Sequence, residues 1–78
     1  MITVEEFTNR VEEEFEILEP GTLFPDTNFR DLEVWDSMHA LIMIALVDTE
    51  FDVLISGNDL KTANTVRDIY QIVEDRIN

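Results

Sequence analysis

The chain has 78 residues, 18 acidic and five basic side chains, a formal net charge of -13 and no cysteine. This length and 45% hydrophobic content predict one small globular domain over residues 1–78. The charge argues against nucleic acid or anionic membranes as partners and favours a basic protein surface. The absence of cysteine excludes disulfides and thiolate metal sites and is compatible with the cytoplasm.

Neither the opening residues nor the longest apolar run predicts export or membrane insertion. The opening MITVEEF is acidic within six residues, which argues against a signal or transit peptide. The longest apolar run, residues 40–47, is far shorter than the roughly 20 residues of a membrane span. We therefore expect a cytoplasmic protein without a membrane partner.

A first helix is predicted from Val4 onward. Thr3 and Glu6 have the spacing of a capping box, and Ile2 and Phe7 occupy the positions of a hydrophobic staple. The expected apolar stripe is Phe7, Val11, Phe15 and Leu18, and the sequence EPG at residues 19–21 should end the helix.

Residues 19–36 have no long periodic pattern, and so long a loop is uncommon in a small domain unless it is functional. The segment FRDLEVW, residues 29–35, is expected to contain a short helical turn. The apolar residues expected to tether the loop to the core are Leu23, Phe24, Phe29, Leu32 and Trp35.

A second helix is predicted over residues 37–51. Helical spacing assigns Leu41, Ile44, Val47 and Phe51 to the core face, together with Ala40. The opposite face then holds His39, Ile42, Leu46, Thr49 and Glu50. Two large aliphatic residues on an outer face need a partner, so Ile42 and Leu46 either form a recognition patch or are covered by the chain itself.

Two further helices follow in the last third of the chain. Ser56 with Asp59 and Thr65 with Asp68 resemble capping boxes, the first of a short helix and the second of the final helix. The apolar stripe of the final helix is Val66, Ile69, Tyr70, Val73 and Ile77. The predicted fold is therefore all-α, a small bundle of three main helices plus one short helix.

The sequence gives no support to catalysis by this chain. His39 is its only histidine, and on a helix it points about 200° away from Ser37, so it cannot activate that hydroxyl. With one histidine and no cysteine, a zinc site would have to rely largely on carboxylates, and the sequence has neither a calcium-binding loop nor a glycine-rich phosphate loop. We expect a protein that is not an enzyme.

The pair Asp36-Ser37 stands immediately before the apolar run of the second helix. A helix start favours a bound or attached anion, so a phosphodiester on Ser37 would be well placed. Asp36 or Ser37 acting only as the N-cap is the alternative, because both residue types fill that role routinely.

The segment WDSMHALIMIALVDTEFDVLI, followed by NTVRDI, resembles the acyl carrier protein family, whose Asp-Ser motif opens the second helix. The resemblance extends over essentially the whole chain, including an acidic first helix, a long loop, Ile55 and Thr65-Val66. It implies that Ser37 carries 4'-phosphopantetheine, transferred from coenzyme A by a phosphopantetheinyl transferase. The arm's thiol would then hold an acyl or aminoacyl group as a thioester.

The resemblance also implies how the remaining site residues act. Asp36 would help the transferase dock or bind its metal, and the protein is expected to be a monomer. The expected partners are the transferase, a loading ligase and acyl-transferring enzymes of fatty acid, polyketide or related lipid metabolism, with basic or apolar docking surfaces. The expected partner-binding residues are Met38, His39, Ile42, Leu46, Asp48 and Glu50.

Several positions depart from the family pattern. Val34 replaces a frequent glycine, Trp35 directly precedes the aspartate, and His39 and Ile42 stand where fatty acid carriers often have acids. These departures favour a specialised pathway with a more apolar docking surface. A cargo pocket or ordinary core could be formed by Met43, Ile44, Val47 and Ile55.

Two alternative functions stay open. The Asp-Ser-Met motif also resembles D-alanyl carrier proteins, which would imply an adenylating ligase and a small polar load. The charge alone would also suit a small acidic interaction protein or nucleic-acid mimic that is not modified.

Overall fold

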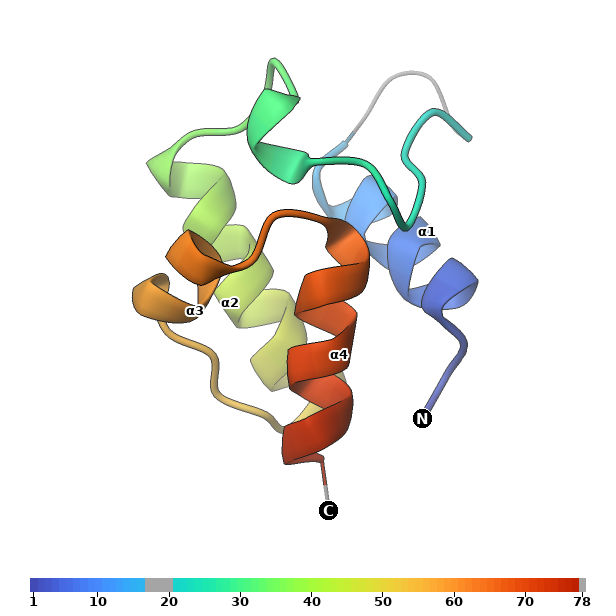
Figure 1. Cartoon of the computed structure of the whole chain (residues 1–78), viewed down its shortest axis with the longest axis vertical. Coiled ribbons are helices and arrows are strands. Elements are labelled where there is room, and N and C mark those ends of the chain that lie inside the picture. The colour runs from blue at the N-terminus through green and yellow to red at the C-terminus, as the bar shows by residue number, and fades with distance from the viewer. Residues whose placement is uncertain (17–20, 78) are drawn as a thin grey trace.

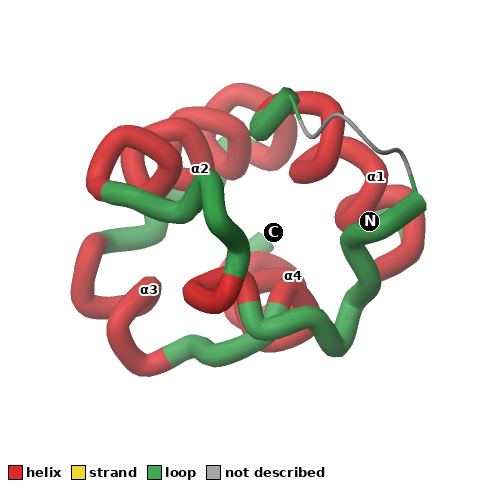
Figure 2. The backbone as a smooth tube through the Cα atoms, turned by 90° about the horizontal axis from the view of Figure 1, so that it is seen from above, coloured by secondary structure: helices red, strands yellow, loops and turns green. Residues whose placement is uncertain are grey.

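The computed structural model describes residues 1–16 and 21–77, and within them the fold is helical. The elements are α1 (Val4–Glu14), the 3-10 turn η1 (Phe29–Asp31), α2 (Ser37–Phe51), α3 (Gly57–Thr62) and α4 (Val66–Arg76). Figure 1 shows α3 as a short helix beside α2 and α4. In the view from above, α1, α2 and α4 surround a common centre (Figure 2). The predicted bundle of three main helices and one short helix is confirmed.

The helix starts lie where the capping residues predict them. The Thr3 hydroxyl accepts a hydrogen bond from the Glu6 N–H at 3.2 Å, so α1 begins at Val4. Reciprocal capping boxes are present at α3 and α4, where Asp59 and Asp68 occupy the third helical position. Short polar side chains therefore satisfy backbone groups that would otherwise be unpaired at these starts.

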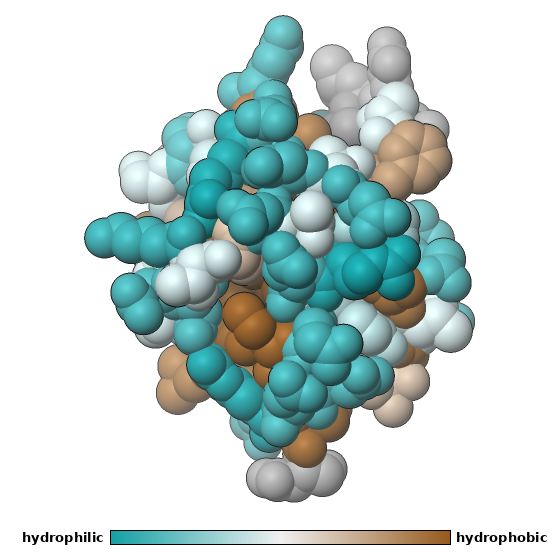
Figure 3. Space-filling model, viewed as in Figure 1, coloured by the Kyte–Doolittle hydropathy of each residue, from teal (hydrophilic) through white to brown (hydrophobic). Residues whose placement is uncertain are grey.

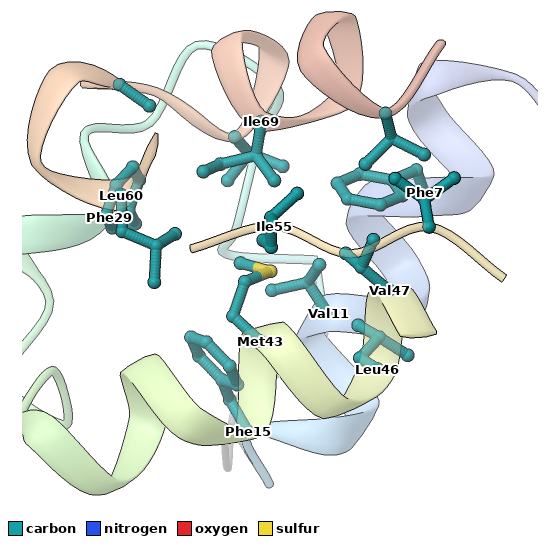
Figure 4. Close-up of a cluster of buried hydrophobic side chains, with 14 of the residues drawn as sticks. Phe7, Val11, Phe15, Phe29, Met43, Leu46, Val47, Ile55, Leu60 and Ile69 are labelled. Carbon is teal, nitrogen blue, oxygen red and sulfur yellow. The ribbon is translucent and has the colours of Figure 1, made fainter. Parts of the chain in front are cut away.

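The core is one hydrophobic cluster to which all four α-helices contribute. Phe7 and Val11 come from α1, Met43 and Val47 from α2, and all four are fully buried. Figure 4 shows Met43 pointing from α2 toward Ile55 in the loop after that helix. The residues considered for a cargo pocket lie in or against this cluster, as expected of ordinary core: Met43, Ile44, Val47 and Ile55.

The long first loop is attached to α4 and to the core. The N–H groups of Val66 and Arg67 donate to the carbonyls of Thr27 (3.2 Å) and Pro25 (2.8 Å). Of the five predicted tethers, Leu23 and Phe29 are buried, and Leu32 and Trp35 pack against the core. The prediction is wrong for Phe24, which is 59% exposed because it lies on a tight turn closed by hydrogen bonds with Thr27.

The first helix ends earlier than the sequence pattern predicts. α1 ends at Glu14, and Glu16 adopts a left-handed backbone conformation with φ 54°. Phe15 directly follows α1 and packs against Trp35 and His39. Leu18, the last residue of the predicted stripe, lies outside the described residues, as do two residues of the EPG signal.

The second helix has the predicted bounds but a different inner face. Met43, Leu46 and Val47 are its buried residues, whereas Leu41 is 67% exposed. The assignment of Leu41 to the core is therefore wrong, and of the two alternatives for Leu46 the structure shows the one in which the chain covers it. The physical reason is that α2 is apolar on nearly every side, so its periodicity does not select a face, and contacts with neighbouring elements do.

Candidate functional site

The candidate site is the start of α2, where Asp36 caps the helix. Its backbone is extended, its side chain accepts a hydrogen bond from the His39 N–H at 2.8 Å, and its carbonyl accepts from Ala40 at 3.0 Å. Ser37 is the first residue of the helix. Of the two capping alternatives, Asp36 is the N-cap, which releases the Ser37 hydroxyl from that role.

The two serines of the sequence differ in what their hydroxyls do. The Ser56 hydroxyl accepts from the Asp59 N–H at 3.2 Å and bonds the Asp59 carboxylate at 3.1 Å. Ser37 is exposed, and its hydroxyl makes no hydrogen bond with any residue that the structure describes. Ser37 therefore offers an accessible oxygen at the positive end of a helix dipole.

The His39 ring contacts Asp36 and makes no hydrogen bond with Ser37. Its Nδ1 lies 2.8 Å from Asp36 Oδ1, and its ring packs edge-on against Phe15 at 5.0 Å between centroids. The hydrogen bond from this ring, with a further one from the His39 backbone, holds the pKa of the Asp36 carboxyl below its usual value. Asp36 is therefore a carboxylate at neutral pH.

Exposed apolar residues surround this helix start. Met38 is 64% exposed and Leu41 is 67% exposed, and they lie three residues apart on α2, while Val34 is exposed just before it. We call Val34, Met38 and Leu41 the apolar patch. Met38 was predicted as a contact residue, whereas Val34 and Leu41 were not, and all three are exposed. Their closeness in sequence to Ser37 was the signal that could have identified them.

Most of the other predicted contact residues are less accessible or already paired. Leu46 is 5% exposed and Ile42 is half-buried, so the chain itself covers most of the expected recognition patch. With Glu14 and Thr49 they line a groove of about 210 Å³ between α1 and α2. Glu50 forms an ion pair with Arg10 at 2.8 Å, whereas Asp48 is exposed.

All four arginines form ion pairs or hydrogen bonds with other residues of the chain. Arg10, Arg67 and Arg76 pair with Glu50, Asp26 and Asp59, and Arg30 donates to the Leu60 carbonyl at 2.6 Å. The face over α3 and α4 is mostly hydrophilic (Figure 3). Among the described residues, no group of three or more acidic or histidine side chains is placed to hold a metal ion. Because the arginines are paired within the chain, this strongly acidic protein offers few unpaired cationic side chains to a partner.

Comparison with known proteins decides the family. The model of the phosphopantetheine attachment site matches residues 5–73. The chain belongs to this phosphopantetheine-binding family. Its cofactor is covalently attached 4'-phosphopantetheine, and the free hydroxyl at the start of α2 fits a phosphodiester attachment.

A solved structure shows the same fold. The solution structure of a holo acyl carrier protein from Geobacter metallireducens superposes with a TM-score of 0.77 and 20% identity, covering 97% of this chain and 86% of that one. No curated protein matches this sequence significantly. Within the described residues, every helix falls short of the length and apolar character that a membrane span requires.

Proposed function

We propose that this protein is an acyl carrier protein whose arm is attached to Ser37. The observation that carries the proposal is the structure at the start of α2. Asp36 caps the helix, and the Ser37 hydroxyl is exposed and makes no hydrogen bond with any described residue. When bound, the arm supplies a thiol that holds the load as a thioester.

The residues around Ser37 indicate that attachment depends on a separate transferase. The Ser37 oxygen forms a bond to a phosphorus of coenzyme A, the bond to the adenosine-bearing phosphate breaks, and adenosine 3',5'-bisphosphate leaves. The serine proton must pass to a base of the transferase, because the Ser37 hydroxyl makes no hydrogen bond to His39 or to any other described residue. The start of α2 then stabilises the negative phosphodiester through its N–H groups and dipole.

The apolar patch is the proposed contact surface for acyl-handling enzymes. Val34, Met38 and Leu41 lie within one helical turn of Ser37 along the chain, so a partner that receives the arm also meets these side chains. The first turn of α2 has no acidic residue. Partner docking at this end is therefore proposed to be more apolar than ionic, with Asp48 contributing charge farther along the helix.

The proposed load is an acyl chain of fatty acid, polyketide or related specialised metabolism. Support comes from the apolar patch, which offers a contact surface to an apolar load beside the attachment point. The cytoplasm stays the predicted location, since coenzyme A and the transferase must be present in the same compartment. A D-alanyl load would instead be identified by the mass of the loaded protein.

The experiment that tests this function uses the two serines as a matched pair. The parent protein, Ser37→Ala and Ser56→Ala are incubated with a broad-specificity phosphopantetheinyl transferase and coenzyme A, and intact masses are measured. We expect one phosphopantetheine on the parent and on Ser56→Ala, and none on Ser37→Ala. An unmodified parent, or a modified Ser37→Ala protein, would contradict the proposal.

A further inference from the structure

The carboxylate of Asp36 is held by His39 through two hydrogen bonds to one oxygen. Asp36 Oδ1 accepts from the His39 backbone N–H and bonds the His39 Nδ1, each at 2.8 Å. A carboxylate only accepts hydrogen bonds, so Nδ1 carries a proton in this contact. The Asp36 side chain is nevertheless 60% exposed. It is therefore ordered and accessible at the same time.

The His39 ring is itself held by a row of aromatic residues. It packs edge-on against Phe15 with an interplanar angle of 84°, and its side chain is only 18% exposed. The ring centroids of Phe15 and Trp35 are 6.1 Å apart, and those of Trp35 and the buried Phe29 are 4.7 Å apart. Trp35 directly precedes Asp36 and His39 lies three residues after it, and both rings pack against the same Phe15 phenyl ring.

We propose that His39 is a positioning residue for modification: it holds the Asp36 carboxylate in one orientation beside Ser37, ready to accept a cationic or N–H group of the transferase. This inference rests on the proposed attachment at Ser37. A free aspartate samples several rotamers, and ordering it during docking costs conformational entropy. His39 removes that cost before the transferase arrives. In this proposal Asp36 contacts the docking enzyme and not the reacting phosphorus, so His39 acts on binding of the carrier.

Two substitutions separate the hydrogen bond from the packing. His39→Phe keeps a ring against Phe15 but removes the donor, whereas His39→Asn keeps a donor at the Nδ1 position but removes the ring. For transfer from coenzyme A, we expect His39→Phe to raise the KM for the carrier roughly tenfold, the scale of one charge-assisted hydrogen bond, with little change in kcat. His39→Asn should keep KM within about twofold of the parent while lowering Tm.

A double variant tests whether His39 acts through Asp36. In an Asp36→Asn background, His39→Phe should change KM by less than about twofold, because the carboxylate that it orients is already gone. A full tenfold effect in that background would overturn the proposal. A parental KM for His39→Phe, or a raised KM for His39→Asn, would also overturn it and leave His39 a packing residue.

The end point of the same reaction distinguishes this inference from the proposed function. A slow His39→Phe variant should still reach complete modification of Ser37 after long incubation, as intact mass shows. A parent protein that gains no mass at any time rejects both the attachment at Ser37 and the role of His39. A parent and a His39→Phe variant modified at equal rates reject only the role of His39.

Discussion

Arg76, in the last turn of α4, binds both carboxylate oxygens of Asp59, at 2.7 and 2.8 Å. Asp59 is also the third helical residue of α3, where its side chain accepts from the Ser56 N–H at 2.8 Å. The ion pair with Arg76, followed by the bond from Ser56, holds the pKa of Asp59 far below its usual range. One carboxylate thus caps α3 and fastens it to the end of α4.

Acid should destabilise the fold by protonating Asp59 and the other capping carboxylates. The pKa values of Asp36, Asp59 and Asp68 are all lowered in the folded state. A lowered pKa means that the stabilisation is fully present above the unfolded value, about 4, and is lost as the pH falls through the folded value. We expect the free energy of unfolding to fall progressively below about pH 4. Denaturant titrations across pH measure it.

Asp59→Asn provides the matched control for that effect. It removes the titrating charge but keeps an oxygen that can accept from the Ser56 N–H, so the variant should be less stable at neutral pH and lose less stability in acid. A pH dependence identical to that of the parent would show that Asp59 does not contribute to acid sensitivity.

The buried carboxylate of Glu12 should be essential for the structure of the first loop. It accepts from the backbone N–H groups of Gly21 (2.8 Å) and Leu23 (2.9 Å). Glu12→Ala leaves both donors without this acceptor and should cost about 2 kcal/mol of unfolding free energy. The exposed neighbour Glu13→Ala should change stability by less than about 0.5 kcal/mol in the same denaturant titration. Equal effects would argue against this role.

Substitutions at Leu46 should lower the stability of the fold, whereas substitutions at Leu41 should impair acyl transfer to a partner enzyme. Leu46→Ala creates a cavity under α1 and should cost about 2 to 4 kcal/mol, whereas Leu41→Ala should cost less than about 0.5 kcal/mol. Leu41→Glu should instead slow acyl transfer to a partner enzyme while leaving Tm nearly unchanged. Thermal unfolding and transfer assays on the three variants check both statements. A large loss of Tm in Leu41→Ala would place that residue in the core.

Salt should stabilise the protein. The formal net charge of -13 creates self-repulsion in the compact state, which added ions screen. We expect the Tm to rise when sodium chloride is increased at neutral pH, and to rise further with a divalent cation. A Tm that is indifferent to both would show that repulsion does not limit stability.

The sequence predicted the helix starts well because each has a local chemical signal. Thr3, Ser56 and Thr65 are followed at the right spacing by acids, and Asp36 precedes an apolar run, so few long-range contacts were needed. The predicted α2 bounds, residues 37–51, agree with the structure. The family resemblance, carried by the residues around Asp36-Ser37, is confirmed.

The buried face of each helix was less predictable, because it depends on the elements that pack against that helix. α2 is apolar on nearly all sides, so the choice between Leu41 and Met43 as core residue is made by contacts with the rest of the bundle. The bond between His39 and Asp36 was also missed. Spacing on the helix excluded His39 as a base for Ser37, but the contact with Phe15 that holds its ring comes from a different part of the chain.

The central claim, that Ser37 carries the arm in the cell, is tested most directly on protein isolated from its own source cells. Fragmentation mass spectrometry across residues 30–45 would locate any modification and, from the mass on the thiol, its load. We expect phosphopantetheine on Ser37, free or acylated, in a substantial fraction of molecules. Unmodified Ser37 in every molecule would contradict the claim and leave an acidic helical protein that acts through its surface alone.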